Sequence, residues 1–292
     1  FYVSKTAVPL FLMISGALLL PRQDSLRQNG RRILRMVIVL AAASFFYSGT
    51  DALFAGKPFQ IGRFLMTLYQ SEVTGSFWYL YLYLGVLVML PVLQPMTRAL
   101  GEGERNYFLI ASGVVSSVLP FAFLFLPAMN VNFALPLFSA TLGLLMAGAC
   151  FDRRRMGRAG LWIAVACAVL LPLLPTLLAS FGEPYYFNFF DNYFLITVTG
   201  AAVGIFCICR HACARRPGGE RAEAFWAEAG KLTFGTFLLG DFLSARCAFL
   251  MGALDGFLPV NLAGLLYTCL VFLLGMGITW LLRLLPPVRR VL

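Results

Sequence analysis

The stretch FLPVNLAGLLYTCLVFLLGMGITWLL, residues 257–282, contains no charged side chain. The hydrocarbon core of a bilayer is about 30 Å thick, and a helix of about 20 apolar residues crosses it. This stretch is long enough to do so, and the uncharged run ends at Arg283. It therefore predicts a membrane-spanning helix near the end of the chain.

The rest of the chain has the same character. Of its 292 residues, 60% are hydrophobic and 12% are charged, whereas soluble domains average about 45–50% apolar and about 25% charged residues. Nine apolar segments follow one another, and none shows the period-2 alternation of a membrane β-barrel, so helices are expected. The segments cover residues 1–20, 33–54, 77–96, 107–128, 133–151, 161–181, 193–209, 232–250 and 257–285. We predict an all-α, polytopic transmembrane helical bundle, with residues 1–292 forming a single integral-membrane domain.

The basic residues orient these segments. The chain has 23 Lys and Arg against 13 Asp and Glu, which gives a net charge of +10. All but four of the basic residues fall in alternate turns, on one side of the predicted bundle; the exceptions are Lys5, Lys57, Arg63 and Arg246. The positive-inside rule makes the basic side and the C-terminus cytoplasmic. The net charge is therefore an orientation signal, and no nucleic-acid partner is expected.

The same orientation places Phe1 on the outer side. The chain starts there without Met and without a basic flank, so we expect a tenth span to precede Phe1 and the sequence to be incomplete at its N-terminus.

Cysteines give no sign of a disulfide framework, because their number is odd and most lie within apolar segments. Cys207, Cys209, His211 and Cys213 have a C-x-C-x-H-x-C spacing. On a continuous helix, residues two apart point in different directions, so these four converge on zinc only if the helix unwinds. The alternative is a helix end rich in small residues, and no metal site is predicted.

Two places carry informative charges. Arg32 and Arg35, next to Arg31, are three apart and share one helix face at the cytoplasmic end of the second segment. They either grip one anion or anchor the helix to lipid phosphates. Asp241 lies in the middle of the eighth segment, five residues before Arg246. An intramembrane carboxylate marks a functional site by default, and a structural, hydrogen-bonded role is the alternative.

Four motifs carry a resemblance to a known family. Residues 8–16, VPLFLMISG, resemble the V-P-x-F-F-x-x-S-G signature of the membrane-bound acyltransferase 3 family, and Arg32 to Arg35 match its R-x-x-R element. Residues 77–81, FWYLY, are similar to its H-x-W-[FY]-L-Y segment, and residues 230–239, GKLTFGTFLL, to its S-F-G-I-Y-L-I-H element. Together, the order and spacing of these motifs cover most of the chain.

The resemblance implies transfer of an acyl group, usually acetyl, from cytoplasmic acyl-CoA to a hydroxyl of an envelope glycan or lipid-linked acceptor. It implies a multi-pass protein of a bacterial-type inner membrane, with acetyl-CoA as donor substrate and no permanently bound cofactor. Arg31, Arg32 and Arg35 would bind the CoA phosphates. Ser15, Tyr79, Tyr81, Asp241 and Arg246 are the candidates for the acceptor pocket, although the hydroxyl-bearing residues among them are also ordinary packing residues.

The chain departs from the family at the expected basic groups. The family base is a His on the first transmembrane helix, which would precede Phe1. The His that usually precedes the Trp is absent: Phe77 adjoins Trp78 and Ser76 comes before it. Gly240 stands where the late element usually has His, with Asp241 next. The catalytic residue is therefore unassigned within this sequence. We expect the missing start of the chain to carry the base, and a degenerate family member without one is the alternative. Asp241 is a further candidate within the chain.

Two other functional classes stay open. A transporter or flippase would use Asp241 and Arg246 as a mid-bilayer substrate site and should show an internal repeat, which we do not find. A non-catalytic membrane sensor would need no donor pocket.

Overall fold

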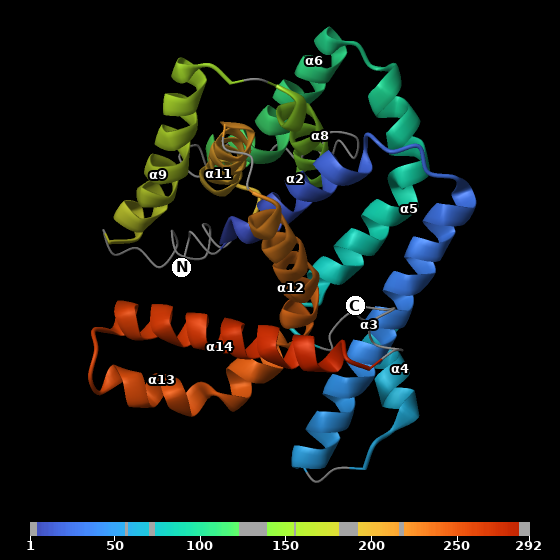
Figure 1. The fold of residues 1–292 in the computed structure, drawn as a ribbon, viewed down its shortest axis with the longest axis vertical. Helices are drawn as coiled ribbons and strands as arrows, with labels where there is room; N and C mark the ends of the chain where they lie inside the picture. Colours follow the sequence, from blue (N-terminus) through green and yellow to red (C-terminus); the bar gives the residue numbers. More distant parts are fainter. Residues whose placement is uncertain are drawn as a thin grey trace. The chain divides into compact units, whose positions relative to one another are not determined.

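The structure is a computed structural model that describes residues 5–55, 58–69, 74–122, 139–154, 156–180, 192–215 and 219–285. Every regular element in these ranges is a helix (Figure 1). Parts of four predicted segments, residues 1–4, 123–128, 133–138 and 181, lie outside the described residues, as does Lys57.

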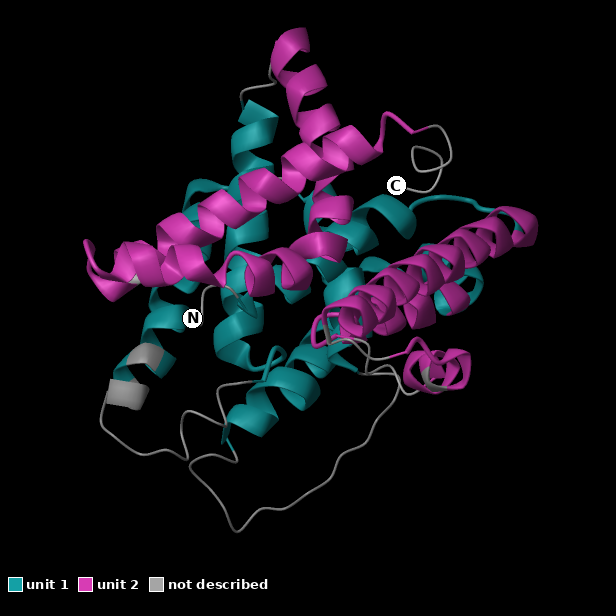
Figure 2. Ribbon diagram, turned by 90° about the horizontal axis from the view of Figure 1, so that it is seen from below, with its two compact units in different colours: residues 1–25, 89–217 teal, residues 26–88, 218–292 magenta. Residues whose placement is uncertain are grey.

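The helices form two compact units, each built from two separate stretches of the chain (Figure 2). Unit 1 comprises residues 1–25 and 89–217, and unit 2 comprises residues 26–88 and 218–292. The boundary at residue 88 falls within a single helix, α5 (Trp78–Ala99), so this helix contributes to both units.

Unit 1 is organised around three helices that contact one another: α2 (Ala7–Leu19), α8 (Ala140–Arg153) and α11 (Ile196–Arg215). The helix α9 (Arg158–Ser180) packs on α11, and α6 (Glu102–Gly113) packs on α8. The α6 helix continues through the π-helical turn η1 (Val114–Val118) into α7 (Leu119–Ala122).

Close approach of α2 and α8 depends on two glycines. A Cβ at Gly16 would lie 1.9 Å from the Leu145 backbone oxygen, and a Cβ at Gly148 would lie 1.9 Å from the Met13 backbone oxygen. Small residues at a helix interface let two backbones approach closely in a membrane, where packing drives association. Gly16 ends the first family-like motif, so that part of the motif has a packing role.

Unit 2 contains α3 (Leu26–Ala55), α4 (Ile61–Tyr69), the first part of α5, α12 (Glu220–Arg246), α13 (Ala248–Asp255) and α14 (Val260–Leu282). The helices α12 and α14 pack along each other, and α13 lies against α14. The buried amide of Asn29 on α3 donates a hydrogen bond to the Leu87 carbonyl of α5 at 2.8 Å. This bond joins the two helices near Arg32 to Arg35, which we call the arginine motif.

In the described part of the chain, five helices are long and apolar enough to cross a membrane, or six if α12 and α13 together form one span. The five cover Leu26–Phe54, Trp78–Ala99, Arg158–Pro175, Ile196–Arg215 and Leu262–Leu282. Large apolar side chains such as Trp162, Leu170 and Leu273 are mainly exposed on these helices, which is typical of a lipid-facing surface. The prediction of an all-helical membrane protein is confirmed, and the count of nine spans stays a prediction.

The eighth predicted segment, residues 232–250, is not one straight helix in the structure. The chain bends by 59° between α12 and α13, and the break falls at Cys247. Apolar composition continues through the bend, so the sequence reads as one segment. The break leaves Arg246 as the last residue of α12.

Candidate functional site

Asp241 lies on α12 and faces the turn that leads into α5. Its Oδ2 atom accepts hydrogen bonds from the Ser76 hydroxyl at 2.6 Å and from the Ser76 backbone N–H at 3.2 Å. The Thr74 hydroxyl donates to the same oxygen. A carboxylate in this place satisfies backbone and side-chain donors at the beginning of a helix, where negative charge is favourable.

Tyr47 of α3 holds the same turn of α12 from another side. Its hydroxyl donates to the Leu238 carbonyl at 3.0 Å and accepts from the Phe242 backbone N–H at 3.0 Å. In a regular α-helix, the N–H of residue 242 would pair with the carbonyl of residue 238. The tyrosine hydroxyl therefore bridges the two backbone groups that flank Asp241.

Aromatic rings pack around this bridge. The Tyr47 ring lies 5.3 Å from the Phe77 ring and 6.4 Å from the Phe242 ring, both in edge-to-face geometry. Phe77 is fully buried. We call Tyr47, Thr74, Ser76 and Asp241 the Asp241 cluster. Tyr47 is buried among aromatic rings and the other three residues are half-buried, and hydrogen bonds that are shielded from water are stronger than those in water.

The cluster joins two positions at which the chain departs from the family motifs. Ser76 stands two residues before Trp78, and Asp241 follows Gly240. Although these residues are far apart in sequence, the Ser76 hydroxyl is hydrogen-bonded to the Asp241 carboxylate. Of the four residues in the cluster, the sequence identifies only Asp241 as a candidate. Ser76 stands where the family has His, and nothing in the sequence points to Tyr47 or Thr74.

Arg246 has a different neighbour. Its guanidinium carbon lies 3.4 Å from the centre of the Phe54 ring and 5.7 Å from the centre of the Phe242 ring. No ion pair between Arg246 and Asp241 occurs in the described structure. The exposed cation lies against aromatic faces, to which the ring electrons attract it.

The two tyrosines of the aromatic motif lie on the first half of α5. The Tyr79 ring stacks on Tyr83 and meets the Phe237 ring of α12 edge to face. The Tyr81 hydroxyl donates to the Leu68 carbonyl near the end of α4. Both side chains are half-buried, and each joins α5 to another helix of unit 2.

The arginine motif lies on the early turns of α3. Arg31 and Arg35 are exposed, and Arg32 is half-buried. Arg35 and Tyr47 are on the same helix, twelve residues apart, which corresponds to about 18 Å along its axis. The cationic end of α3 and the Asp241 cluster are therefore separated by more than half of a bilayer's hydrocarbon core, which is about 30 Å thick.

Ser15 lies apart from these residues in unit 1. It is half-buried on α2, directly before the Gly16 that packs against α8.

The cysteine-rich segment with His211 is helical. The α11 helix runs from Ile196 to Arg215 without unwinding. No group of three or more His, Cys, Asp or Glu side chains in the described ranges is arranged to hold a metal ion.

A family model described as an acyltransferase domain, that of the acyltransferase 3 family, matches residues 1–284. This match covers nearly the whole chain and confirms the resemblance read from the four motifs. No curated protein matches the chain. No solved structure matches it either.

Proposed function

Because the chain belongs to the membrane acyltransferase 3 family, we propose that it transfers an acyl group, with acetyl expected, from cytoplasmic acyl-CoA to a hydroxyl of an envelope glycan or lipid-linked acceptor. The family match over residues 1–284 carries this proposal. The reaction breaks the thioester C–S bond and forms an ester C–O bond. A base takes the hydroxyl proton as the oxygen attacks, and the CoA thiolate that departs takes up a proton in turn, so the products are the ester and free CoA.

In this proposal, Arg31, Arg32 and Arg35 bind the donor phosphates. Guanidinium groups form short, bidentate hydrogen bonds with phosphate oxygens, and two of them three residues apart on a helix reach the same anion. Arg31 and Arg35 are exposed, so a donor in the cytoplasm would reach them if the orientation expected from the charges holds. The separation of about 18 Å along α3 to Tyr47 requires the acyl arm of the donor to extend along the helix into the bilayer.

The Asp241 cluster would bind the acceptor hydroxyl. Every hydrogen bond recorded between the Asp241 carboxylate and the described residues goes to its Oδ2 atom. The Oδ1 atom then has acceptor capacity for a substrate hydroxyl. Ser76 and Thr74 fix the carboxylate, and Tyr47 fixes the turn that carries it, so the direction of this hydrogen bond is set before substrate arrives.

A transporter or flippase would need Asp241 and Arg246 to line one substrate site. Asp241 instead bonds to the turn before α5, and Arg246 lies on Phe54. The geometry gives each charge its own partner and does not favour that function.

Binding of labelled acetyl-CoA to purified protein tests the donor site. We expect Arg32→Ala and Arg35→Ala each to weaken binding about tenfold or more, since a hydrogen bond to a charged group contributes about 1.5–3 kcal/mol. Arg221→Ala is the matched control, because Arg221 is exposed at the beginning of α12 in the same unit. Folded wild-type protein that binds no acetyl-CoA, or binds it equally well without these arginines, would contradict the donor assignment.

The acceptor is tested in cells. Acylation of envelope glycans is compared between cells with and without the gene, and between wild type and Asp241→Asn. Asparagine keeps the size of the side chain but exchanges one acceptor oxygen for a donor. We expect loss of acylation in the deletion and a strong decrease in the variant, with acetyl-CoA binding retained. Unchanged acylation in the variant would remove Asp241 from the acceptor site.

A further inference from the structure

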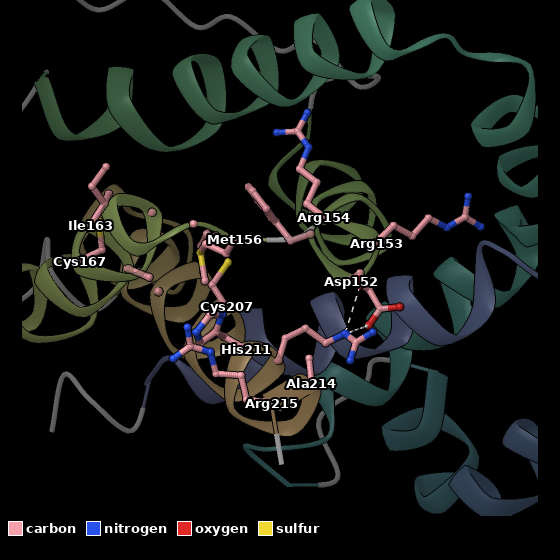
Figure 3. Close-up of a pocket in the computed structure, with 17 residues that line it drawn as sticks. Asp152, Arg153, Arg154, Met156, Ile163, Cys167, Cys207, His211, Ala214 and Arg215 are labelled. Atoms are coloured by element: carbon pink, nitrogen blue, oxygen red, sulfur yellow. Dashed lines mark hydrogen bonds and ion pairs between the residues drawn. The ribbon is translucent and has the colours of Figure 1, made fainter. Parts of the chain in front are cut away.

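Unit 1 contains a cavity of about 1020 Å³, to which the proposed function assigns no role. Three helices of this unit line it: the end of α8, the start and first half of α9, and the second half of α11 (Figure 3). Its apolar wall includes Ile163, Ala164, Cys167, Val203 and Cys207. Its polar rim consists of Asp152, Arg153, Arg154, Arg210, His211 and Arg215. The cavity therefore combines a hydrocarbon-like wall with a cationic rim.

The rim carries more positive charge than its one carboxylate balances. The Arg210 Nε atom lies 2.6 Å from the Asp152 Oδ1 atom, and Arg154 donates a hydrogen bond to Asn106 of α6. Arg215 makes no hydrogen bond or ion pair with another residue of the described ranges. In Figure 3, the Arg153 side chain points away from α9 and α11, so Arg215 is the main cation left for a ligand.

His211 provides the second observation. Its Nε2 atom is buried and has no hydrogen-bond partner among the described residues. A buried polar atom without a partner is unfavourable by about 1–3 kcal/mol. His211 and Arg215 are four residues apart on α11 and therefore share one face of that helix. Both side chains line the cavity on the α11 side.

The wall of the cavity is reached from the lipid-facing surface of α9. Ile163 lines the cavity and is 64% exposed, and the neighbouring Trp162 is 73% exposed. Along the same wall, a Cβ at Gly204 would lie 2.4 Å from the Ala164 backbone oxygen, so α9 and α11 touch there. An amphiphile in the bilayer thus has a route to the cavity along α9.

We propose that this α8–α9–α11 cavity binds an anionic phospholipid. The phosphate accepts hydrogen bonds from Arg215, and the imidazole of His211 turns its buried Nε2 atom toward the same phosphate when the lipid binds. One acyl chain lies along Ile163 and Cys167. Basic pockets between membrane helices bind anionic headgroups in this way. A zwitterionic headgroup brings its own cation to a rim that already has excess positive charge, so it binds less well. The apolar, lipid-facing wall distinguishes this ligand from a soluble anion.

Full-chain protein in lipid nanodiscs tests the proposal. A trace of spin-labelled phosphatidylglycerol is added to discs of phosphatidylcholine, and its immobilised fraction is measured. We expect Arg215→Gln to weaken binding about fivefold, which corresponds to the contribution of about one basic side chain at a membrane surface. His211→Gln as a single substitution should also weaken binding of the labelled lipid. Arg215→Lys should retain most of the binding because it keeps the charge.

Arg158→Gln is the matched control. Arg158 is exposed at the start of α9 and does not line the cavity. Its substitution by Gln removes the same charge as Arg215→Gln does. We expect its effect to be much smaller than that of Arg215→Gln. Equal effects of the two substitutions would overturn the proposal. So would equal immobilisation of labelled phosphatidylcholine, or displacement of the labelled lipid by millimolar inorganic phosphate, which would indicate a soluble anion instead.

Discussion

Tyr47 is a single side chain that completes the hydrogen bonding of another helix. Its hydroxyl contacts both the Leu238 carbonyl and the Phe242 amide, so Tyr47→Phe removes one hydrogen bond from each of these backbone groups. We expect a loss of about 1 kcal/mol in the free energy of unfolding, measured by denaturant titration in detergent micelles. Tyr69→Phe is the control, because Tyr69 is 88% exposed, and it should change stability by less than about 0.5 kcal/mol.

The bond between Ser76 and Asp241 predicts energetic coupling. Ser76→Ala removes one donor from the carboxylate and Asp241→Ala removes the acceptor, so both single variants lose the Ser76 hydroxyl bond, whereas the double variant loses it only once. The effects on unfolding free energy should be non-additive by about 0.5–3 kcal/mol. Thr233 lies eight residues before Asp241 on α12, about 12 Å along the axis, so Thr233→Ala should be additive with Asp241→Ala. Additivity of both pairs would show that the Ser76 bond does not form.

At the scale of the helix, Gly16 decides how closely α2 and α8 pack. A methyl group there meets the Leu145 backbone oxygen at 1.9 Å, and backbone cannot move aside as a flexible side chain does. Gly16→Ala should therefore lower the unfolding free energy by about 3 kcal/mol. Gly277→Ala tests the same exchange in α14, where nothing lies within 4 Å. It should be neutral or stabilise by up to about 1 kcal/mol because alanine favours helix.

The length of the apolar segments is enough to predict the helices. Each predicted segment is mainly helical where it is described, with turns or bends at residues such as 193–195 and 283–285, because backbone polar groups in lipid must pair within the segment. The bend at Cys247 and the π-helical turn η1 could not be predicted from the sequence, because the apolar composition continues through both of them. The site divides in the same way. An intramembrane Asp241 attracts attention in any sequence, whereas Tyr47 is one aromatic residue among many until α3 and α12 are placed together.

At the scale of the whole molecule, the family signature is distributed over both units. VPLFLMISG belongs to unit 1, whereas the arginine motif, the aromatic motif and the late glycine-rich motif belong to unit 2. Unit 2 thus holds both the proposed phosphate-binding arginines and the Asp241 cluster. Unit 1 holds the packing motif and the lipid cavity.

The charge distribution predicts the orientation of the whole chain, and thiol labelling measures it. Cys213 is exposed near the basic end of α11, and Asp255 is exposed at the end of α13, among turns with few basic residues. One variant keeps Cys213 as its single cysteine, and a second carries Asp255→Cys alone. Because Lys and Arg are retained on the cytoplasmic side during insertion, a membrane-impermeant maleimide should label the Asp255→Cys variant in intact cells. It should label Cys213 only in inverted vesicles. The reverse pattern would show the opposite orientation in the membrane. Arg31, Arg32 and Arg35 would then face away from cytoplasmic acyl-CoA.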